Sequence, residues 1–243
     1  MKHTLGCIRR ADDDFNMIKD GDRIAIGISG GKDSTLMLQA FQLYQLFSPK
    51  KFTLHALMVD LGFPGFDPVP LQTLCESIHI PMTVVNTNIG TVVFDKRQEK
   101  NPCALCAKLR KGAFYNKAQE LGLNKAAFAH HREDVLETLL MSLFYEARIN
   151  TFSPVTHLSK TGITLIRPFI YLSEKHIISV VKKNNLPVIK NSCPACGNTK
   201  RQEMKELFKE LTKKYPKCKE MMLSALRNTE KYNLWDKINT KDE

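Results

Sequence analysis

Two pairs of cysteines carry the clearest chemical signal in this chain. Four of its seven cysteines form C-x-x-C pairs, Cys103 with Cys106 and Cys193 with Cys196. Paired thiolates at this spacing hold zinc or an iron–sulfur cluster. The 86 residues between Cys106 and Cys193 far exceed the ~15–20 residues of a local zinc module, so the fold must bring the two pairs together. The spacing leaves zinc and an iron–sulfur cluster both open.

A second signal is a loop suited to binding phosphate. Residues 27–34 read GISGGKDS and connect a predicted strand to a predicted helix. Adjacent glycines let the backbone approach a phosphate, and the free N–H groups at a helix start bind anions. The loop departs from the common G-x-x-x-x-G-K-[ST] pattern because Asp33 follows Lys32. The candidate nucleotide-binding residues are Ser29, Gly30, Gly31, Lys32, Asp33 and Ser34.

A third segment, residues 129–138, reads AHHREDVLET and also joins a strand end to a helix start. Ligands of open α/β sheets bind at that edge. Asp134 is a candidate Mg²⁺ ligand, because hard carboxylate oxygens suit this ion. His130 and His131 are candidate hydrogen-bond partners of phosphate. The alternative is that the acidic residues only complement the dipole of the helix that begins here.

The order of strands and helices predicts how these three motifs are positioned. We expect strands at 23–28, 52–59, 81–85, 125–130 and from 166, and helices at 34–46, 71–80, 103–121, 134–144 and 173–184. Residues 146–165 are expected to form a loop and hairpin. This alternation predicts an α/β fold with a mostly parallel five-stranded sheet and helices on both faces. We expect residues 1–190 to form this domain with the first cysteine pair, and residues 191–243 to form a basic helical segment that carries the second pair and packs on it.

The loop S-G-G-K-D-S at residues 29–34 resembles the pyrophosphate loop of the adenine-nucleotide α-hydrolase fold. This resemblance implies that ATP is cleaved between its α- and β-phosphates and that the substrate becomes adenylated. It also places the acidic segment around Asp134 across the nucleotide, and Asp60 at the end of the second strand near the adenosine. The alternative is an ordinary Ser/Gly turn at a strand end.

Longer stretches are similar to the tRNA 2-thiocytidine synthetase family. The similar stretches are 102–112 (PCALCAKLRKG), 130–134 (HHRED), 144–145 (FY), 167–168 (RP) and the second cysteine pair with 201–202 (RQ). This resemblance implies a [4Fe-4S] cluster bound by Cys103, Cys106 and either Cys193 or Cys196, with Cys193 preferred. It further implies tRNA as a partner, a cysteine desulfurase persulfide or sulfide as sulfur donor, and a possible homodimer.

Together these features predict a tRNA sulfurtransferase that uses ATP, Mg²⁺ and a [4Fe-4S] cluster. The C2 oxygen of a cytidine would be adenylated and then replaced by sulfur. Asp134, Lys32 and Cys193 are the candidate catalytic residues. Other interpretations remain: a different pyrophosphate-loop enzyme, similar to a lysidine synthetase or a small-molecule sulfur transferase, or a zinc-bound RNA-binding protein without catalysis.

Composition agrees with a polyanionic partner. The 243 residues contain 36 Lys and Arg against 25 Asp and Glu, a formal net charge of +11, which favours nucleic acid. Bases of RNA stack on aromatic rings, for which Phe114, Tyr115 and Tyr145 are candidates. No apolar run reaches the ~18 residues of a membrane span, and we expect a soluble cytoplasmic protein. The candidate phosphate-contacting residues are Lys108, Arg110, Lys111, Lys200, Arg201, Lys205, Lys209, Lys213, Lys214, Lys217 and Lys219.

Overall fold

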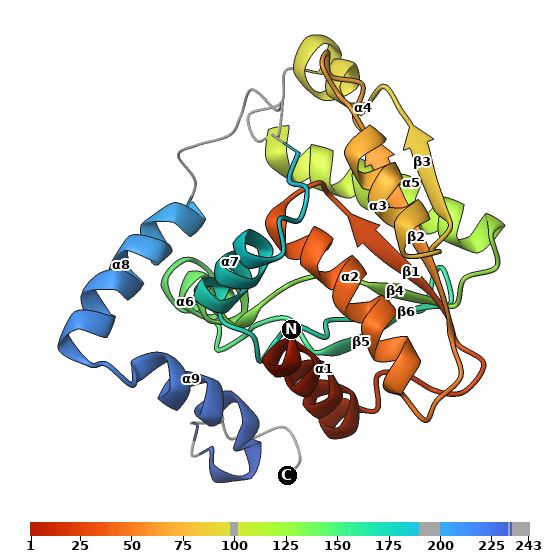
Figure 1. Cartoon of the computed structure of the whole chain (residues 1–243). Coiled ribbons are helices and arrows are strands. Elements are labelled where there is room, and N and C mark those ends of the chain that lie inside the picture. Colours follow the sequence, from red (N-terminus) through yellow and green to blue (C-terminus); the bar gives the residue numbers. More distant parts are fainter. Residues whose placement is uncertain (98–101, 190–199, 233, 235–243) are drawn as a thin grey trace, which may run out of the picture.

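A computed structural model describes residues 1–97, 102–189, 200–232 and 234 (Figure 1). Its sheet has six strands in the order β3-β2-β1-β4-β6-β5. Only β5 is antiparallel to its neighbour; the other pairings in the sheet are parallel. The strands are β1 (Arg23–Ile28), β2 (Thr53–Asp60), β3 (Met82–Asn86), β4 (Lys125–Ala127), β5 (Val155–Leu158) and β6 (Ile163–Ile166).

The mostly parallel α/β sheet is confirmed, and its strand number differs from the prediction by one. The additional strand is β5, which pairs with β6 in the expected hairpin. β4 is shorter than expected, because residues 128–130 leave the sheet after Ala127. β6 ends at Ile166, where the last strand was expected to begin.

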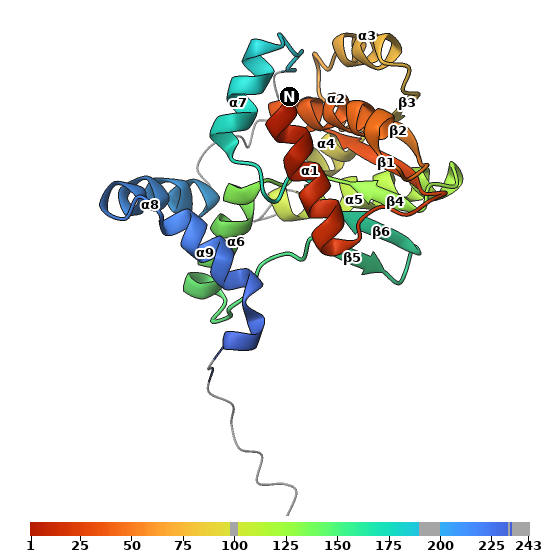
Figure 2. The same cartoon turned by 60° about the horizontal axis from the view of Figure 1, so that its bottom comes forward.

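Helices cover both faces of this sheet (Figure 2). Helices α1, α2, α3 and α7 pack on one face, and α5 packs on the other. The helices are α1 (Lys2–Phe15), α2 (Lys32–Phe47), α3 (Val69–Ser77), α4 (Ile89–Thr91), η1 (Val92–Lys96), α5 (Pro102–Glu120), α6 (Arg132–Tyr145), α7 (Glu174–Lys183), α8 (Lys200–Lys214), α9 (Cys218–Arg227) and η2 (Thr229–Lys231). Among the described residues, no helix is both long and apolar enough to cross a bilayer.

The central strand β1 shows why the sheet needs cover on both sides. Successive side chains of a strand point to opposite faces. Ile24 and Ile26 lie in the core beneath α1, α2 and α7, whereas Ala25 lies in the core beneath α5. The small Ala25 side chain belongs to the same cluster as the bulky Phe114 of α5. Burial on both faces fixes β1 in the middle of the sheet, and with it the loop that follows.

Helices α8 and α9 lie beside α6, away from the sheet (Figure 1). Met204 and Phe208 of α8 form a small buried cluster with Leu136 and Leu140 of α6. The segment 200–227 is therefore docked on α6, which begins at the carboxyl edge of the sheet.

Candidate active site

A cavity of about 600 Å³ opens at the carboxyl edge of the sheet, next to the ends of β1, β2 and β4. Parallel strands bring their carboxyl ends to one edge, which is where open α/β folds bind ligands. The cavity thus collects residues from all three sequence motifs. The predicted site residues in its wall are Ser29, Gly31, Asp33, Ser34, Asp60, Cys103, Cys106, His130 and Asp134.

The loop between β1 and α2 is held in shape by its own hydroxyl groups. Ser34 Oγ accepts a hydrogen bond from Ser29 N (3.1 Å) and donates one to Gly31 O (3.0 Å). Gly30 has a φ of +81°, and a Cβ there would lie 3.0 Å from Ile189 Cβ. Only glycine adopts this φ readily. The loop is therefore fixed as an anion-binding turn at the start of the 16-residue helix α2.

Lys32 lies beside the cavity but is not part of its wall. Its ammonium group forms ion pairs with Asp33 and Glu174, both at 3.0 Å. Burial alone would lower the pKa of Lys32, but these two carboxylates raise it, so the side chain stays charged. The other oxygen of Asp33, Oδ1, is buried and has no hydrogen-bond partner among the described residues. This oxygen is a free acceptor in a wall that otherwise suits a phosphate and its cation.

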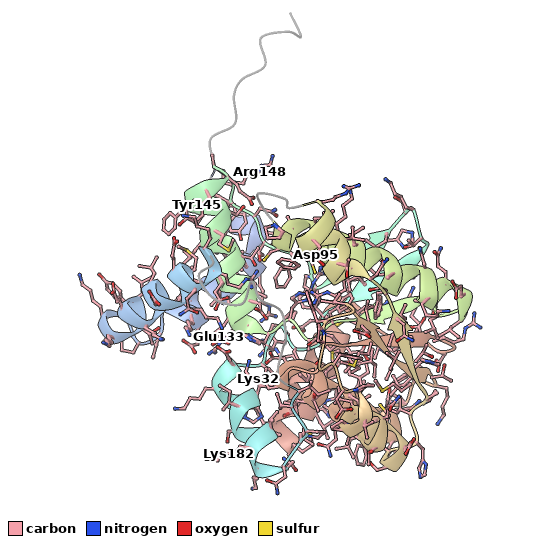
Figure 3. The ribbon with its side chains drawn as sticks, turned by 90° about the horizontal axis from the view of Figure 1, so that it is seen from above. Lys32, Asp95, Glu133, Tyr145, Arg148 and Lys182 are labelled. Carbon is pink, nitrogen blue, oxygen red and sulfur yellow. The ribbon has the colours of Figure 1, made fainter. Side chains whose placement is uncertain are left out.

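The start of α6 concentrates charge around the buried His131, which is the N-cap of the helix and also lies behind the cavity wall. Its Nε2 atom lies 3.5 Å from Asp134 Oδ2 and 3.9 Å from Asp33 Oδ1, and its Nδ1 atom lies 3.5 Å from Glu133 Oε2. Burial would lower the pKa of His131, but the three carboxylates raise it. Figure 3 shows Glu133 of this cluster near Lys32, both away from Tyr145 at the other end of α6.

The surroundings of His130 lower its pKa, whereas those of His131 raise it. Burial, with the positive charge of Arg167, lowers its pKa to about 4. Its Nδ1 atom is buried and has no hydrogen-bond partner among the described residues. His130 is therefore a neutral imidazole in the cavity wall, able to bind a ligand through hydrogen bonds without adding charge. Strongly shifted pKa values of this kind gather at functional sites.

Cys103 and Cys106 lie on the first turn of α5 and both line the cavity. Residues three apart on a helix share one face, so the two thiols can bind one metal centre. Cys193 and Cys196 lie outside the described residues, and so do Gly197 and the segment around them. Among the described residues, no group of three or more His, Cys, Asp or Glu side chains is arranged as a metal site.

Two cations that we assigned to RNA from the sequence line the cavity. Arg110 and Lys111 follow the cysteine pair on α5 and form part of the wall. Their place was not evident from the sequence, because a helical charge run usually faces solvent. They add positive charge to the cavity wall that also contains the cysteines.

Arg201 is a third residue whose contact with the site was unexpected. Its guanidinium group donates to Asp134 Oδ1 (3.0 Å), to Thr138 Oγ1 (3.3 Å) and to the buried Glu137 (3.5 Å). Burial raises the pKa of Glu137 to about 7. Arg201 lies 67 residues from Asp134 in the chain, so no local pattern in the sequence could reveal the pairing.

The other RNA-binding candidates differ in how far their side chains are exposed. Phe114 belongs to the core and also lines the cavity, and Tyr115 packs against it. Tyr145 remains exposed at the end of α6. Lys205 and Lys219 form ion pairs with Glu174 and Glu133 inside the fold. The candidates that are exposed on the C-terminal helices are Lys200, Lys209, Lys213, Lys214 and Lys217.

Known proteins are similar to this sequence along nearly its whole length. Residues 7–211 match the PP-loop domain family. A tRNA-cytidine(32) 2-sulfurtransferase of Pelobacter propionicus is 36% identical over 239 residues, which cover 97% of this chain and 88% of the relative. The enzyme of the same name from Geobacter metallireducens is 36% identical over 95% of this chain and 91% of the relative. The chain belongs to the tRNA-cytidine(32) 2-sulfurtransferase family. The resemblance to tRNA 2-thiocytidine synthetases is thereby confirmed.

Solved structures agree on the fold. The U34-tRNA thiolase NcsA from Methanococcus maripaludis, determined with its [4Fe-4S] cluster, superposes with a TM-score of 0.78 and 22% identity, covering 96% of this chain and 79% of the thiolase. The NH3-dependent NAD synthetase of Campylobacter jejuni superposes with a TM-score of 0.51 and 14% identity, over 98% and 97% of the two chains. The chain thus shares its overall fold with both of these proteins.

Proposed function

We propose that this chain is an ATP-dependent tRNA thiolase that converts a cytidine to 2-thiocytidine. The observation that carries the proposal is the single cavity whose wall contains the phosphate-binding turn, Asp134 and the first cysteine pair. The names of the curated relatives give cytidine 32 of tRNA as their target, and we assign the same target here.

ATP would bind with its phosphates on the turn at Ser29–Ser34 and its adenosine toward Asp60. The backbone N–H groups at the start of α2 would hold the phosphates. Asp134 and the unpartnered Asp33 Oδ1 offer carboxylate oxygens for Mg²⁺. Lys32, behind the turn, would add positive potential to the phosphate site. These residues position the α-phosphorus for attack and offset the charge that develops on it.

Cys103 and Cys106 fit a [4Fe-4S] cluster, because both thiols lie in the wall of the same cavity. Cys193 or Cys196 would supply the third ligand. Held by these residues, such a cluster would supply sulfide to the substrate. Arg110 and Lys111 beside the cysteines would neutralise bound sulfide and the phosphate chain.

The reaction would proceed in two displacements. The C2 oxygen of the cytidine attacks the α-phosphorus, an oxygen–phosphorus bond forms, and pyrophosphate leaves. Sulfide then attacks C2, the carbon–oxygen bond breaks, and AMP leaves with the original oxygen. The neutral His130 in the wall can donate a hydrogen bond to the leaving AMP. The exposed lysines of α8 and α9 would contact tRNA phosphates.

The test is thiolation by anaerobically purified protein. In vitro transcribed tRNA with cytidine at position 32 is incubated with Mg-ATP and sulfide, and its nucleosides are analysed by mass spectrometry. A parallel reaction replaces sulfide by a cysteine desulfurase and cysteine. We expect 2-thiocytidine, with AMP and pyrophosphate released in equal amounts, and several irons per chain.

Matched cysteine variants separate the cluster role from general damage. Cys103→Ser should abolish thiolation and lower the iron content, whereas Cys218→Ser, on α9 outside the cavity, should retain both. Full activity of the Cys103→Ser variant, or one zinc and no iron per chain in the active protein, would overturn the cluster assignment. Failure to release AMP with tRNA and sulfide present would overturn the enzymatic function.

A further inference from the structure

Both oxygens of the Asp134 carboxylate are engaged in this structure. Oδ2 accepts a hydrogen bond from the His131 N–H (2.9 Å), and Oδ1 is bound by Arg201 Nη1 (3.0 Å). Each carboxylate oxygen keeps a further lone pair, so a divalent cation can bind Asp134, but at Oδ1 it would lie beside the positively charged Arg201 guanidinium, which repels it. The hydrogen bond from the His131 backbone N–H to Asp134 is part of the capping box that begins α6. The side-chain partner, Arg201, is therefore the one that can move.

Arg201 has a second carboxylate within reach. The same Nη1 atom lies 3.5 Å from Glu137 Oε2, one turn further along α6. Glu137 is 2% exposed, and its hydrogen bond within the described part of the chain is the one to Arg201. A cationic partner stabilises the ionised form of a buried carboxylate such as Glu137, whose pKa burial raises to about 7. Nη1 of Arg201 at present makes a short contact with Asp134 and a long contact with Glu137.

The rest of α8 keeps Arg201 in place whichever carboxylate it binds. Met204 and Phe208 anchor the helix on α6 through buried apolar contacts. Lys205, one turn after Arg201, pairs with Glu174 at 3.3 Å, and that carboxylate also binds Lys32 of the phosphate-binding turn. Arg201 can thus exchange partners by a side-chain movement, without undocking the helix.

We propose that Arg201 is a positioning residue that exchanges Asp134 for Glu137 when Mg-ATP binds. With Asp134 free of metal, Arg201 neutralises it and holds its carboxylate at the cavity wall. When Mg²⁺ takes Asp134, Arg201 moves fully onto Glu137 and leaves no buried charge unpaired. The inference rests on the proposed nucleotide site, in which Asp134 is a Mg²⁺ ligand.

The exchange predicts opposite effects of two substitutions. Arg201→Gln removes the competitor of Mg²⁺, so less Mg²⁺ should be needed for half-maximal ATP binding. Glu137→Gln removes the second partner and leaves Arg201 on Asp134, so more Mg²⁺ should be needed. Coupling of an exposed charge pair is worth up to about a fivefold change in a binding constant, and we expect shifts of about that size in each direction. Arg201→Gln should also weaken ATP binding measured in EDTA, because a cation near the phosphates is lost.

The measurement is isothermal titration of ATP into the purified protein at a series of Mg²⁺ concentrations. Arg148→Gln is the matched control, since Arg148 is exposed and lies at the other end of α6 from Glu133 (Figure 3). It should leave the Mg²⁺ midpoint unchanged. Melting temperatures show that each variant is folded.

The outcomes are distinct. Midpoints that move in opposite directions for Arg201→Gln and Glu137→Gln support the exchange. Midpoints that stay at the wild-type value, or move together, overturn it while leaving the nucleotide site intact. Wild-type affinity for ATP that does not depend on Mg²⁺ would overturn the assignment of Asp134 as a metal ligand, and the exchange with it.

Discussion

Replacing Gly27 by alanine should block the nucleotide cavity with a side chain of the protein itself. Gly27 is in β1 directly below the phosphate-binding turn. A Cβ at this position would lie 2.4 Å from Phe128 Cε1 and 2.5 Å from Phe128 Cδ1. Carbon atoms in contact stay about 3.5–4.0 Å apart, so the Phe128 ring must move by about 1 Å or more.

The direction of that movement follows from the packing around Phe128. Its ring packs against Phe114, with centroids 5.0 Å apart, and against Tyr115 and His130 at 6.5 and 6.2 Å. The remaining side faces the cavity, whose wall includes Phe128. Overpacking of this kind costs about 1–3 kcal/mol. If the displaced ring occupies volume that the nucleotide needs, ATP can bind only by pushing the ring back into the overpacked position. That energy then weakens ATP binding by about 5- to 150-fold.

Calorimetric ATP titration and thermal unfolding measure both effects. The control is Gly6→Ala on α1, where a Cβ has open space within 4 Å; it should stabilise the helix by up to about 1 kcal/mol and leave ATP binding unchanged. The double variant Gly27→Ala/Phe128→Leu should regain most of the ATP affinity. Wild-type affinity in Gly27→Ala, or no recovery in the double variant, would refute the reasoning.

Three further outcomes follow from burial and charge. Burial raises the pKa of Glu137 from 4.5 to about 7, so the native state holds this proton more tightly than the unfolded chain and loses stability as pH rises between these values. The melting temperature of Glu137→Gln, relative to that of the wild type, should therefore be higher at pH 8 than at pH 5. An equal difference in melting temperature at both pH values would contradict this. The His130 imidazole, with its pKa lowered to about 4, should show no NMR titration between pH 6 and 8, and a midpoint near 6.5 would show that it is not desolvated. Phe208→Ala should cost about 3–5 kcal/mol in urea unfolding, because Phe208 fills the buried contact of α8 with α6; a loss below about 1 kcal/mol would mean that α8 is not firmly docked.

The parallel sheet could be predicted because its signals are local. Buried apolar runs such as Arg23–Ile28 end in turn residues, and each is followed by a helical stretch. The edge strand β5 gave no such signal, since its four residues are at best half-buried. Helix α1 was also not predicted. Its buried face includes Thr4 and Asp12. Asp12 is stabilised by the nearby Ile18 N–H and by Tyr44 and Lys50, which are distant in sequence.

Some residues of the site could likewise be predicted from local signals in the sequence, and others could not. Ser29 and Asp33 were candidates because they belong to the glycine-rich loop between a predicted strand and a predicted helix. Asp60 was a candidate because the resemblance to the pyrophosphate-loop fold places the end of the second strand near the adenosine. The pairing of Arg201 with Asp134 depends on where α8 docks, and that is decided by Met204 and Phe208 rather than by any motif. The ion pair of Lys32 with Glu174 of α7 could not be predicted either, because no spacing rule connects Glu174 to the loop.

The central claim is that the nucleotide and the first cysteine pair share one cavity. It is tested most directly by alkylating the metal-free protein with iodoacetamide, with and without Mg-ATP, and following each cysteine by mass spectrometry. Mg-ATP should slow the modification of Cys103 and Cys106 severalfold, while Cys7 and Cys218, which lie outside the cavity, react at unchanged rates. Equal rates for Cys103 and Cys106 with and without saturating Mg-ATP would contradict a shared site.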